Sequence, residues 1–374
     1  MKKGIATFSL DYGKCPRWLF ERMTKLSSIL IEAIVSEFGT EEFLKRISDP
    51  VWFQSFGCLL AFDWNSSGLT VTTTAAIKKA LSRRNWDLGI YVCGGKGKAS
   101  RKTPEEIDSI NFKFGYENNF KEISKIVAKI DNSLIQDGFT IYHHSFFFDN
   151  LGNWVVIQQG MNTQIQMARR YHWIGKKDAN FENFLNDYHK GIISNIFLPK
   201  VLNLASKESK ENREMTIKIL KEQDPLKEIK TLELILNKNK FLFKELYLPN
   251  IEFKTHPVFY ENFNFEKIKK VIVKSKEEIE SKSNLSFIDI LKTNIGPKTI
   301  RAISLAAEII YGAPPSYRDP ARYTFAHGGK DGTPFFVDIE TYDKTIDVLS
   351  KAIRNAKILS FKEKTNLLFK LNKS

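Results

Sequence analysis

A four-residue turn between two apolar helical stripes constrains this chain more than any other feature of its sequence. Apolar side chains recur on one face of residues 285–291 and again on one face of residues 300–310, a spacing typical of amphipathic helices. Between them lies Thr293-Asn294-Ile295-Gly296, followed by Pro297 at a first helical position, where its missing N–H costs nothing. Gly312 is suited to end the second helix. The stretch therefore predicts a short helix, a tight turn and a longer helix.

The turn itself predicts a binding site for an anion. Asn294 and Gly296 tolerate left-handed backbone, so both ends of the turn are expected to expose N–H groups. Lys298 stands beside the helix N-terminus that follows, and such a terminus attracts anions. The stretch resembles the helix-hairpin-helix element of DNA-binding proteins, whose turn reads Gly-hydrophobic-Gly, with Asn294 in place of the first glycine. This resemblance implies that the turn and Thr299 contact a DNA backbone.

A narrower resemblance concerns catalysis. The segment Gly296-Pro297-Lys298-Thr299 is similar to the Gly-x-Lys-Thr hairpin of helix-hairpin-helix DNA glycosylases. That resemblance implies that Lys298 is a Schiff-base nucleophile and that Asp319 is the catalytic aspartate after the second helix. The positive end of the helix dipole disfavours the charged form of Lys298, which prepares its amine for attack. The plainer interpretation makes Lys298 a phosphate clamp and Asp319 a cap of the following turn. A flipped base also needs aromatic neighbours, and four lie nearby in sequence: Tyr311, Tyr317, Tyr323 and Phe325.

The charge balance favours a polyanionic partner, most simply DNA. The chain has 374 residues, 57 Lys and Arg against 43 Asp and Glu, and a formal net charge of +14. A lysine-rich composition without a nucleic-acid partner is the alternative. The three cysteines are far apart, which excludes a local zinc knuckle and indicates a reducing compartment. The sequence shows neither a signal-peptide core nor a long apolar run, so we expect a soluble, cytoplasmic protein.

A glycine-rich basic loop is the second candidate for phosphate contact. Residues 89–93 read as a buried strand that leads into the loop 94–102, and Thr103-Pro104 is expected to open a helix with a capping box. The loop suits a phosphate backbone or a mobile lid, whereas a bland solvated loop is the alternative. Its spacing does not match a Walker motif. The four cations that we assign to phosphate contact are Lys96, Lys98, Arg101 and Lys102.

Residues 138–160 predict a β-hairpin, because two apolar runs flank the turn signal Asp149-Asn150-Leu151-Gly152-Asn153. Beyond it, Arg169 and Arg170 stand beside three ring side chains, a grouping that holds phosphates and stacks on exposed bases. An exposed cationic helix end beside core aromatics is equally compatible with the pattern. Lys330, in Gly328-Gly329-Lys330, is a candidate for a second phosphate loop or a simple turn.

Several segments together resemble one archaeal and bacterial family, catalogued as domain of unknown function 763, over nearly the full length. The chain departs from that pattern at Asn65, where a histidine is expected. The segments that carry the resemblance are 12–23, 62–68, 94–104, 131–144, 158–162, 169–173 and 325–332.

These observations predict an α+β protein with an N-terminal mixed domain, 1–200, and a helical domain, 201–374, that contains the hairpin. The expected function is DNA repair: recognition of a damaged base in duplex DNA, followed by base removal or strand incision without a cofactor. One alternative is a magnesium-dependent nuclease with ligands from Asp63, Asp131 and Asp137, completed by Gln158. A non-catalytic nucleic-acid-binding protein is another. Zinc is disfavoured, because the neighbours His143 and His144 point to opposite faces of a strand.

Overall fold

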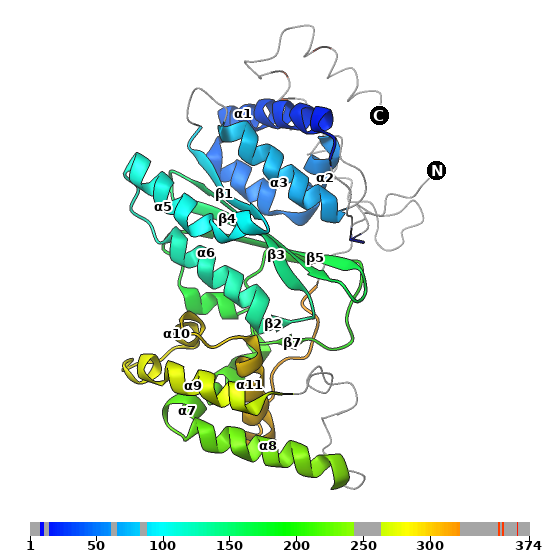
Figure 1. The fold of residues 1–374 in the computed structure, drawn as a ribbon. Coiled ribbons are helices and arrows are strands. Elements are labelled where there is room, and N and C mark those ends of the chain that lie inside the picture. The colour runs from blue at the N-terminus through cyan, green and yellow to red at the C-terminus, as the bar shows by residue number, and fades with distance from the viewer. Residues whose placement is uncertain are drawn as a thin grey trace.

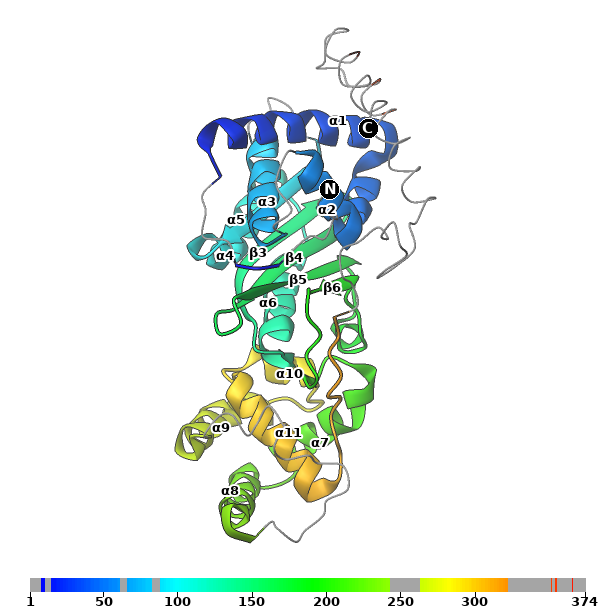
Figure 2. The ribbon, with the colours of Figure 1, turned by 90° about the vertical axis from the view of Figure 1, so that its right-hand side faces the viewer.

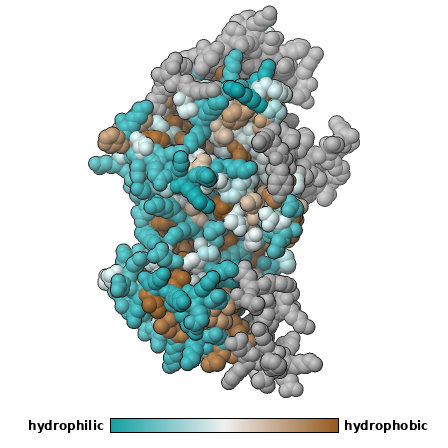
Figure 3. Space-filling model, viewed as in Figure 1, coloured by the Kyte–Doolittle hydropathy of each residue, from teal (hydrophilic) through white to brown (hydrophobic). Residues whose placement is uncertain are grey.

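The computed structural model describes residues 8–10, 15–60, 66–82, 88–242 and 263–321, with the single positions 351, 354 and 365. Within these residues the fold is mixed α+β: an antiparallel sheet has helices on both faces, and further helices extend from one end (Figure 1). Most of the face in Figure 3 is hydrophilic, and apolar patches interrupt it over the helices at the lower end.

The main sheet has five antiparallel strands in the order β1-β3-β4-β5-β6. The predicted hairpin is present, and its turn is held by Asp149, whose Oδ1 accepts hydrogen bonds from the backbone N–H groups of Leu151 and Asn153. The residues after it form a third long strand rather than a helix end, so Arg169 and Arg170 belong to a strand. The strands are β1 (Ile90–Lys96), β3 (Thr140–Asp149), β4 (Asn153–Asn162), β5 (Met167–Lys176) and β6 (Gly191–Ile193).

Helices α1 (Arg17–Ser48), α2 (Pro50–Leu59) and α3 (Ser66–Ser82) cover one face of this sheet. They pack on the side chains that the strands direct to that face, among them Val92, Phe147 and Val155. Gly39 adopts a φ of +84° inside α1 and marks a kink between two helical segments. Asp49 caps α2 and accepts hydrogen bonds from the N–H groups of Val51 and Trp52.

The opposite face is covered by α5 (Thr103–Phe114) and α6 (Phe120–Lys129), with the short helix α4 (Lys98–Arg101) before them. Phe146, Phe148, Trp154 and Trp173 supply the large rings of this core. The expected capping box is absent at the start of α5, because the Thr103 hydroxyl donates to the carbonyl of Ser100. A π-helical turn, η1 (Ile130–Leu134), follows α6, and the 3-10 turn η2 (Phe181–Leu185) follows β5.

The helical end of the molecule surrounds α11 (Pro297–Tyr311), which contacts three neighbouring helices. The other helices there are α7 (Lys210–Lys221), which follows the 3-10 turn η3 (Lys207–Ser209), then α8 (Pro225–Leu242), α9 (Phe265–Glu280) and α10 (Phe287–Lys292). The helices expected beyond residue 200 are therefore present where the structure describes that part of the chain.

The hydrophobic core is continuous across residue 200. The short strands β2 (Ile135–Gln136) and β7 (Leu202–Asn203) pair with each other across that position. One continuous set of buried apolar side chains runs from Tyr91 in β1 to Ala321. The extended residues 312–321, which we call the strap, lead from the end of α11 back to the sheet (Figure 2).

Candidate functional site

The predicted hairpin exists as α10, a turn and α11. Ser286 and Asp289 form a capping box at the start of α10. In the turn, the N–H of Ile295 donates to Thr293 Oγ1 at 3.2 Å. Gly296 is the N-cap of α11 and has no side chain with which to cap that helix.

The backbone of the turn differs from the prediction. Gly296 has φ −98° and ψ 177°, an extended conformation that any residue adopts, and Asn294 also lacks a positive φ. A Cβ atom built on Gly296 would meet no atom within 4 Å. The glycine is thus not required by the fold, and the space beside it is open. Lys298 and Asn294 are exposed, whereas the predicted contact residue Thr299 is buried.

Contacts with the sheet region hold the hairpin in place. Lys129, at the end of α6, donates from Nζ to the carbonyl oxygens of Leu291 and Thr293. Gln136 Nε2 donates to the carbonyl oxygen of Pro297 at 2.9 Å, and Arg301 donates to the same glutamine. Burial lowers the pKa of Lys129 despite the opposing effect of Glu278. The turn is therefore fixed relative to the sheet and presents a rigid surface.

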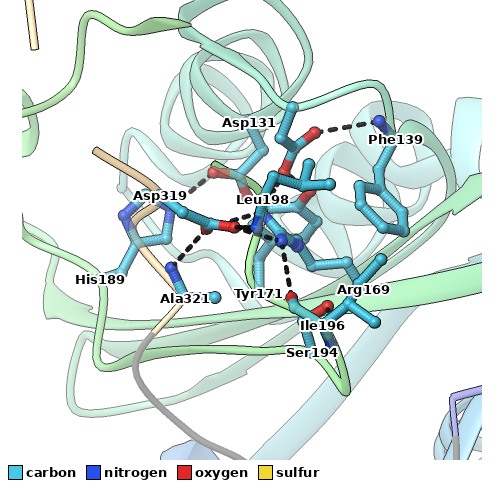
Figure 4. A network of polar contacts seen from close by, with 11 residues as sticks. Asp131, Phe139, Arg169, Tyr171, His189, Ser194, Ile196, Leu198, Asp319 and Ala321 are labelled. Atoms are coloured by element: carbon cyan, nitrogen blue, oxygen red, sulfur yellow. Dashed lines mark hydrogen bonds and ion pairs between the residues drawn. The ribbon is translucent and has the colours of Figure 1, made fainter. Parts of the chain in front are cut away.

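Three of the predicted site residues meet in a buried ion-pair network at the strap (Figure 4). Arg169 Nη1 lies 2.9 Å from Asp137 Oδ2 and 2.9 Å from Asp319 Oδ1, and its Nη2 lies 2.8 Å from Asp319 Oδ2. Tyr171 donates to Asp137 at 2.7 Å. The side chains of Arg169 and Asp137 are fully buried and that of Asp319 is 5% exposed.

Asp319 is saturated by these contacts. Each of its oxygens accepts one bond from Arg169 and one from a backbone N–H, Ala321 on Oδ1 and Leu198 on Oδ2. A carboxylate that stabilises a sugar cation must face its substrate, and this one faces the core. The geometry therefore counts against the expected catalytic role of Asp319 and gives it a structural one.

The acidic groups of the network stabilise the charged form of Arg169. Burial alone would lower the pKa of Arg169, but Asp137, Tyr171 and Asp319 outweigh it and raise that pKa, so the guanidinium stays charged. Burial raises the pKa of Asp137, against the lowering effects of Arg169 and Tyr171. Arg169 stays charged because it donates to two carboxylates at once.

Arg170 points to the other face of the sheet and is also buried. Its guanidinium donates to Thr70 Oγ1 at 3.0 Å and to Gln54 Oε1 at 3.2 Å. It also lies 4.7 Å from the centroid of the Phe53 ring. Burial lowers the pKa of Arg170 to about 9. Neither arginine reaches the surface in this structure, so the expected contact of Arg169 and Arg170 with phosphate is not available to them here.

Asp131 lies in a second buried network beside the first. Its Oδ2 accepts hydrogen bonds from Gln158 Nε2 and, at 2.8 Å, from Trp173 Nε1, and its Oδ1 lies 2.5 Å from His189 Nε2. Asp131 and Asp137 are thus both engaged by protein donors. No group of three metal-ligating side chains occurs among the described residues, and Asp63 lies outside them.

The segment predicted as a loop is the end of β1 followed by helix α4, and its four cations remain at the surface. Lys96, Lys98, Arg101 and Lys102 are exposed, and within the described part of the chain none of them is ion-paired. The base of the loop is fixed, because Glu106 accepts from the N–H of Gly94 at 2.8 Å. A Cβ on Gly94 would lie 2.2 Å from the carbonyl oxygen of His144, so only glycine fits there.

Sequence reasoning missed Tyr171 and His189 as members of these networks. The aromatic residues Tyr171 and Trp173, of a type enriched in strands, were the available signal for β5. No motif near His189 in the sequence indicates that it belongs to the Asp131 network. Three of the predicted positions, Lys330, Tyr323 and Phe325, lie outside the described residues.

A family model described as "Protein of unknown function (DUF763)" matches residues 4–337. The chain belongs to this family. No curated protein and no solved structure matches it. Among the described residues of this DUF763 member, no helix is long and apolar enough to cross a membrane.

Proposed function

We propose that this DUF763 protein binds DNA through the α10–α11 turn and acts on a damaged base in the bound duplex. The observation that carries the proposal is the free space beside Gly296 at the N-terminus of α11. Gly296 leaves room for close approach and has no side chain to cap the helix, and Lys298 is exposed beside it. Backbone N–H groups at such a terminus suit a phosphate oxygen.

The basic loop 96–102 provides further support for a polyanionic partner. Its four cations would contact backbone phosphates, which position a protein on DNA without reading its sequence. The net charge of +14 acts in the same direction by attracting DNA over a distance.

The chemical step of the proposal is assigned to Lys298. Lys298 remains our candidate nucleophile for base removal with strand cleavage, a route that needs no metal. Asp319 does not join it, because both of its oxygens are engaged with Arg169 and the backbone. A protein that binds DNA without cleaving it is the alternative that this arrangement of Asp319 favours.

A panel of duplexes, each with one damaged base, tests the proposal. We expect binding to duplex DNA, and incision of at least one lesion that survives EDTA and yields a borohydride-trapped adduct. Incision abolished by EDTA would favour a metal-dependent nuclease, and binding without any product would favour the non-catalytic alternative. Absence of DNA binding at low salt would overturn the proposal as a whole.

A further inference from the structure

An exposed tryptophan lies in the first turn of α1, far from the α10–α11 turn in the fold (Figure 2). Trp18 is 61% exposed, whereas Trp154 and Trp173 are fully buried in the sheet core. A single exposed ring is common on protein surfaces and needs no explanation by itself. The residues around Trp18 therefore decide what this ring can bind.

Those residues are cations. Arg17, Arg22 and Lys25 are exposed on the same part of α1, and none of them forms an ion pair with an acidic side chain in the described part of the chain. The first turn of the helix contains no acidic residue. Because the start of a helix carries partial positive charge, Arg17 is unfavourable there until an anion binds beside it. We call Arg17, Trp18, Arg22 and Lys25 the α1 patch.

Arg22 holds the indole ring in position. Its guanidinium carbon lies 5.4 Å from the centroid of the Trp18 ring, and its Nη1 donates to the carbonyl oxygen of Trp18 at 3.2 Å. One guanidinium packs against one face of the ring, and the rest of the ring accounts for the exposure. A ring whose orientation is already restricted loses less conformational entropy when a second planar group stacks on it.

Helix α3 connects the α1 patch to the basic loop. Lys79 Nζ on α3 lies 2.7 Å from Glu21 Oε1 on α1, and its neighbour Lys78 donates to the carbonyl oxygen of Gly94, at the base of the loop, at 2.8 Å. The start of α1 and helix α4 lie on the same side of the molecule, on the left in Figure 2. The patch and the loop thus belong to one basic surface.

We infer that the α1 patch binds a single-stranded nucleic acid, with one base stacked on Trp18 and the neighbouring phosphates on Arg17 and Lys25. Bases of a duplex stack on each other, whereas an unpaired base offers its face to an aromatic side chain. This inference goes beyond the proposed function, because contact between the α10–α11 turn and a duplex does not require it.

A membrane surface is the other partner that suits tryptophan among cations, and the patch favours it less. A helix that lies in a membrane interface must bury an apolar face in the lipid. Helix α1 packs its apolar face into the protein core instead, with Met23, Leu30 and Ile31 against the sheet. Trp18 alone remains for lipid on this part of the helix.

The test measures the affinity of the full chain for oligothymidylate and oligouridylate of roughly 12 nucleotides, a length within the usual site size. Trp18→Ala should weaken binding roughly 5- to 150-fold, and Trp18→Phe should retain most of the affinity. Phe112→Ala is the matched control, because it removes a ring that is 92% exposed on α5 and should bind like the wild type. The affinity for a blunt duplex should be unchanged in all three variants.

Salt dependence gives a second readout. Arg17→Gln combined with Lys25→Gln should reduce the slope of log K against log salt by roughly 1.4, since each phosphate contact of a single strand contributes about 0.7. Circular dichroism checks that the variants are folded.

Failure of the wild type to bind either oligonucleotide at low salt overturns the inference, as does a Trp18→Ala variant with wild-type affinity. Binding to phosphatidylserine vesicles that depends on Trp18, without binding to either oligonucleotide, overturns it in favour of a membrane surface. A wild type that binds the single strand through Trp18 but binds no duplex leaves the inference standing and overturns the proposed function.

Discussion

Two adjacent arginines in β5 have opposite surroundings because strand neighbours point to opposite faces. Arg169 enters the core on the α6 side, where Asp137 and Asp319 balance its charge. Arg170 enters on the α3 side, among hydroxyl, amide and aromatic groups. Burial removes both guanidinium groups from water. Only for Arg169 do two carboxylates replace the lost interactions with water.

Asp319→Asn should therefore destabilise the fold instead of only stopping chemistry. It leaves Arg169 paired with Asp137 alone, so the loss should be smaller than the roughly 3–5 kcal/mol of a buried charge left with no partner. Urea unfolding measures the loss. Arg318→Ala is the matched control, because its ion pair with Glu208 is exposed and should contribute little. A fully stable Asp319→Asn variant that releases no base would restore the catalytic interpretation.

The buried imidazole of His143 should make stability depend on pH. Burial, then His144 and Lys96, lower its pKa to about 3. As pH falls below the unfolded value of about 6.5, the unfolded chain binds the proton first, so the stabilisation present above that pH is lost toward the folded pKa.

His143→Gln removes this titration. Between pH 7 and pH 5 its unfolding free energy should fall less steeply than that of the wild type, by up to about 1.4 kcal/mol per pH unit. Denaturant titrations at three pH values give both slopes. Parallel slopes would show that His143 is protonated in the folded protein.

At the scale of elements, sequence patterns correctly predicted the two hairpins, which interactions between nearby residues determine. The β3–β4 hairpin and the α10–α11 hairpin follow from apolar periodicity and turn residues, and both are present. The conformation of Gly296 did not follow, because glycine permits a positive φ without requiring it. Strand β5 was missed since its polar residues were interpreted as surface groups.

Gly296→Ala tests the role of the turn in DNA binding without a change in folding stability. The backbone there suits alanine and its Cβ meets open space, so stability should be unchanged. If a phosphate approaches this turn, the added methyl group should weaken duplex binding by roughly tenfold, or about 1.4 kcal/mol. Gly312→Ala is the control: its φ of +70° should make alanine destabilising by about 1 kcal/mol without a change in DNA affinity. Equal affinity of Gly296→Ala and wild type would remove the turn from the interface.

The basic loop is tested through salt dependence. Lys98→Gln combined with Lys102→Gln should reduce the slope of log K against log salt by roughly two, since each phosphate contact contributes about 0.9. Lys210→Gln, at an exposed position on α7, is the control and should leave the slope unchanged. A double variant with the wild-type slope would mean that the loop stays solvated when DNA binds.

At the scale of the whole molecule, one core joins the sheet to the helical end. The β2–β7 pair, the Gln136 and Lys129 contacts and the Arg169–Asp319 pair all join residues far apart in sequence. No periodicity within 15 residues predicts such partners, which is why the sequence suggested a division at residue 200 and separate roles for Arg169, Asp137 and Asp319.

This shared core predicts cooperative unfolding. Circular dichroism, which reports all helices, and fluorescence of the six tryptophans, which all lie before residue 174, should give coincident denaturation curves. Two transitions at separate urea concentrations would support independent domains despite the shared contacts.

The strap is also the last part of the Arg169 ion-pair network to be synthesised. Asp319 follows Arg169 by 150 residues. At roughly 5–20 residues per second, the ribosome delivers it about 8 to 30 s later. During that interval Arg169 has Asp137 as its carboxylate partner and still lacks the two hydrogen bonds to Asp319. Translation that stops before the strap therefore yields a chain in which the buried guanidinium is paired with Asp137 alone.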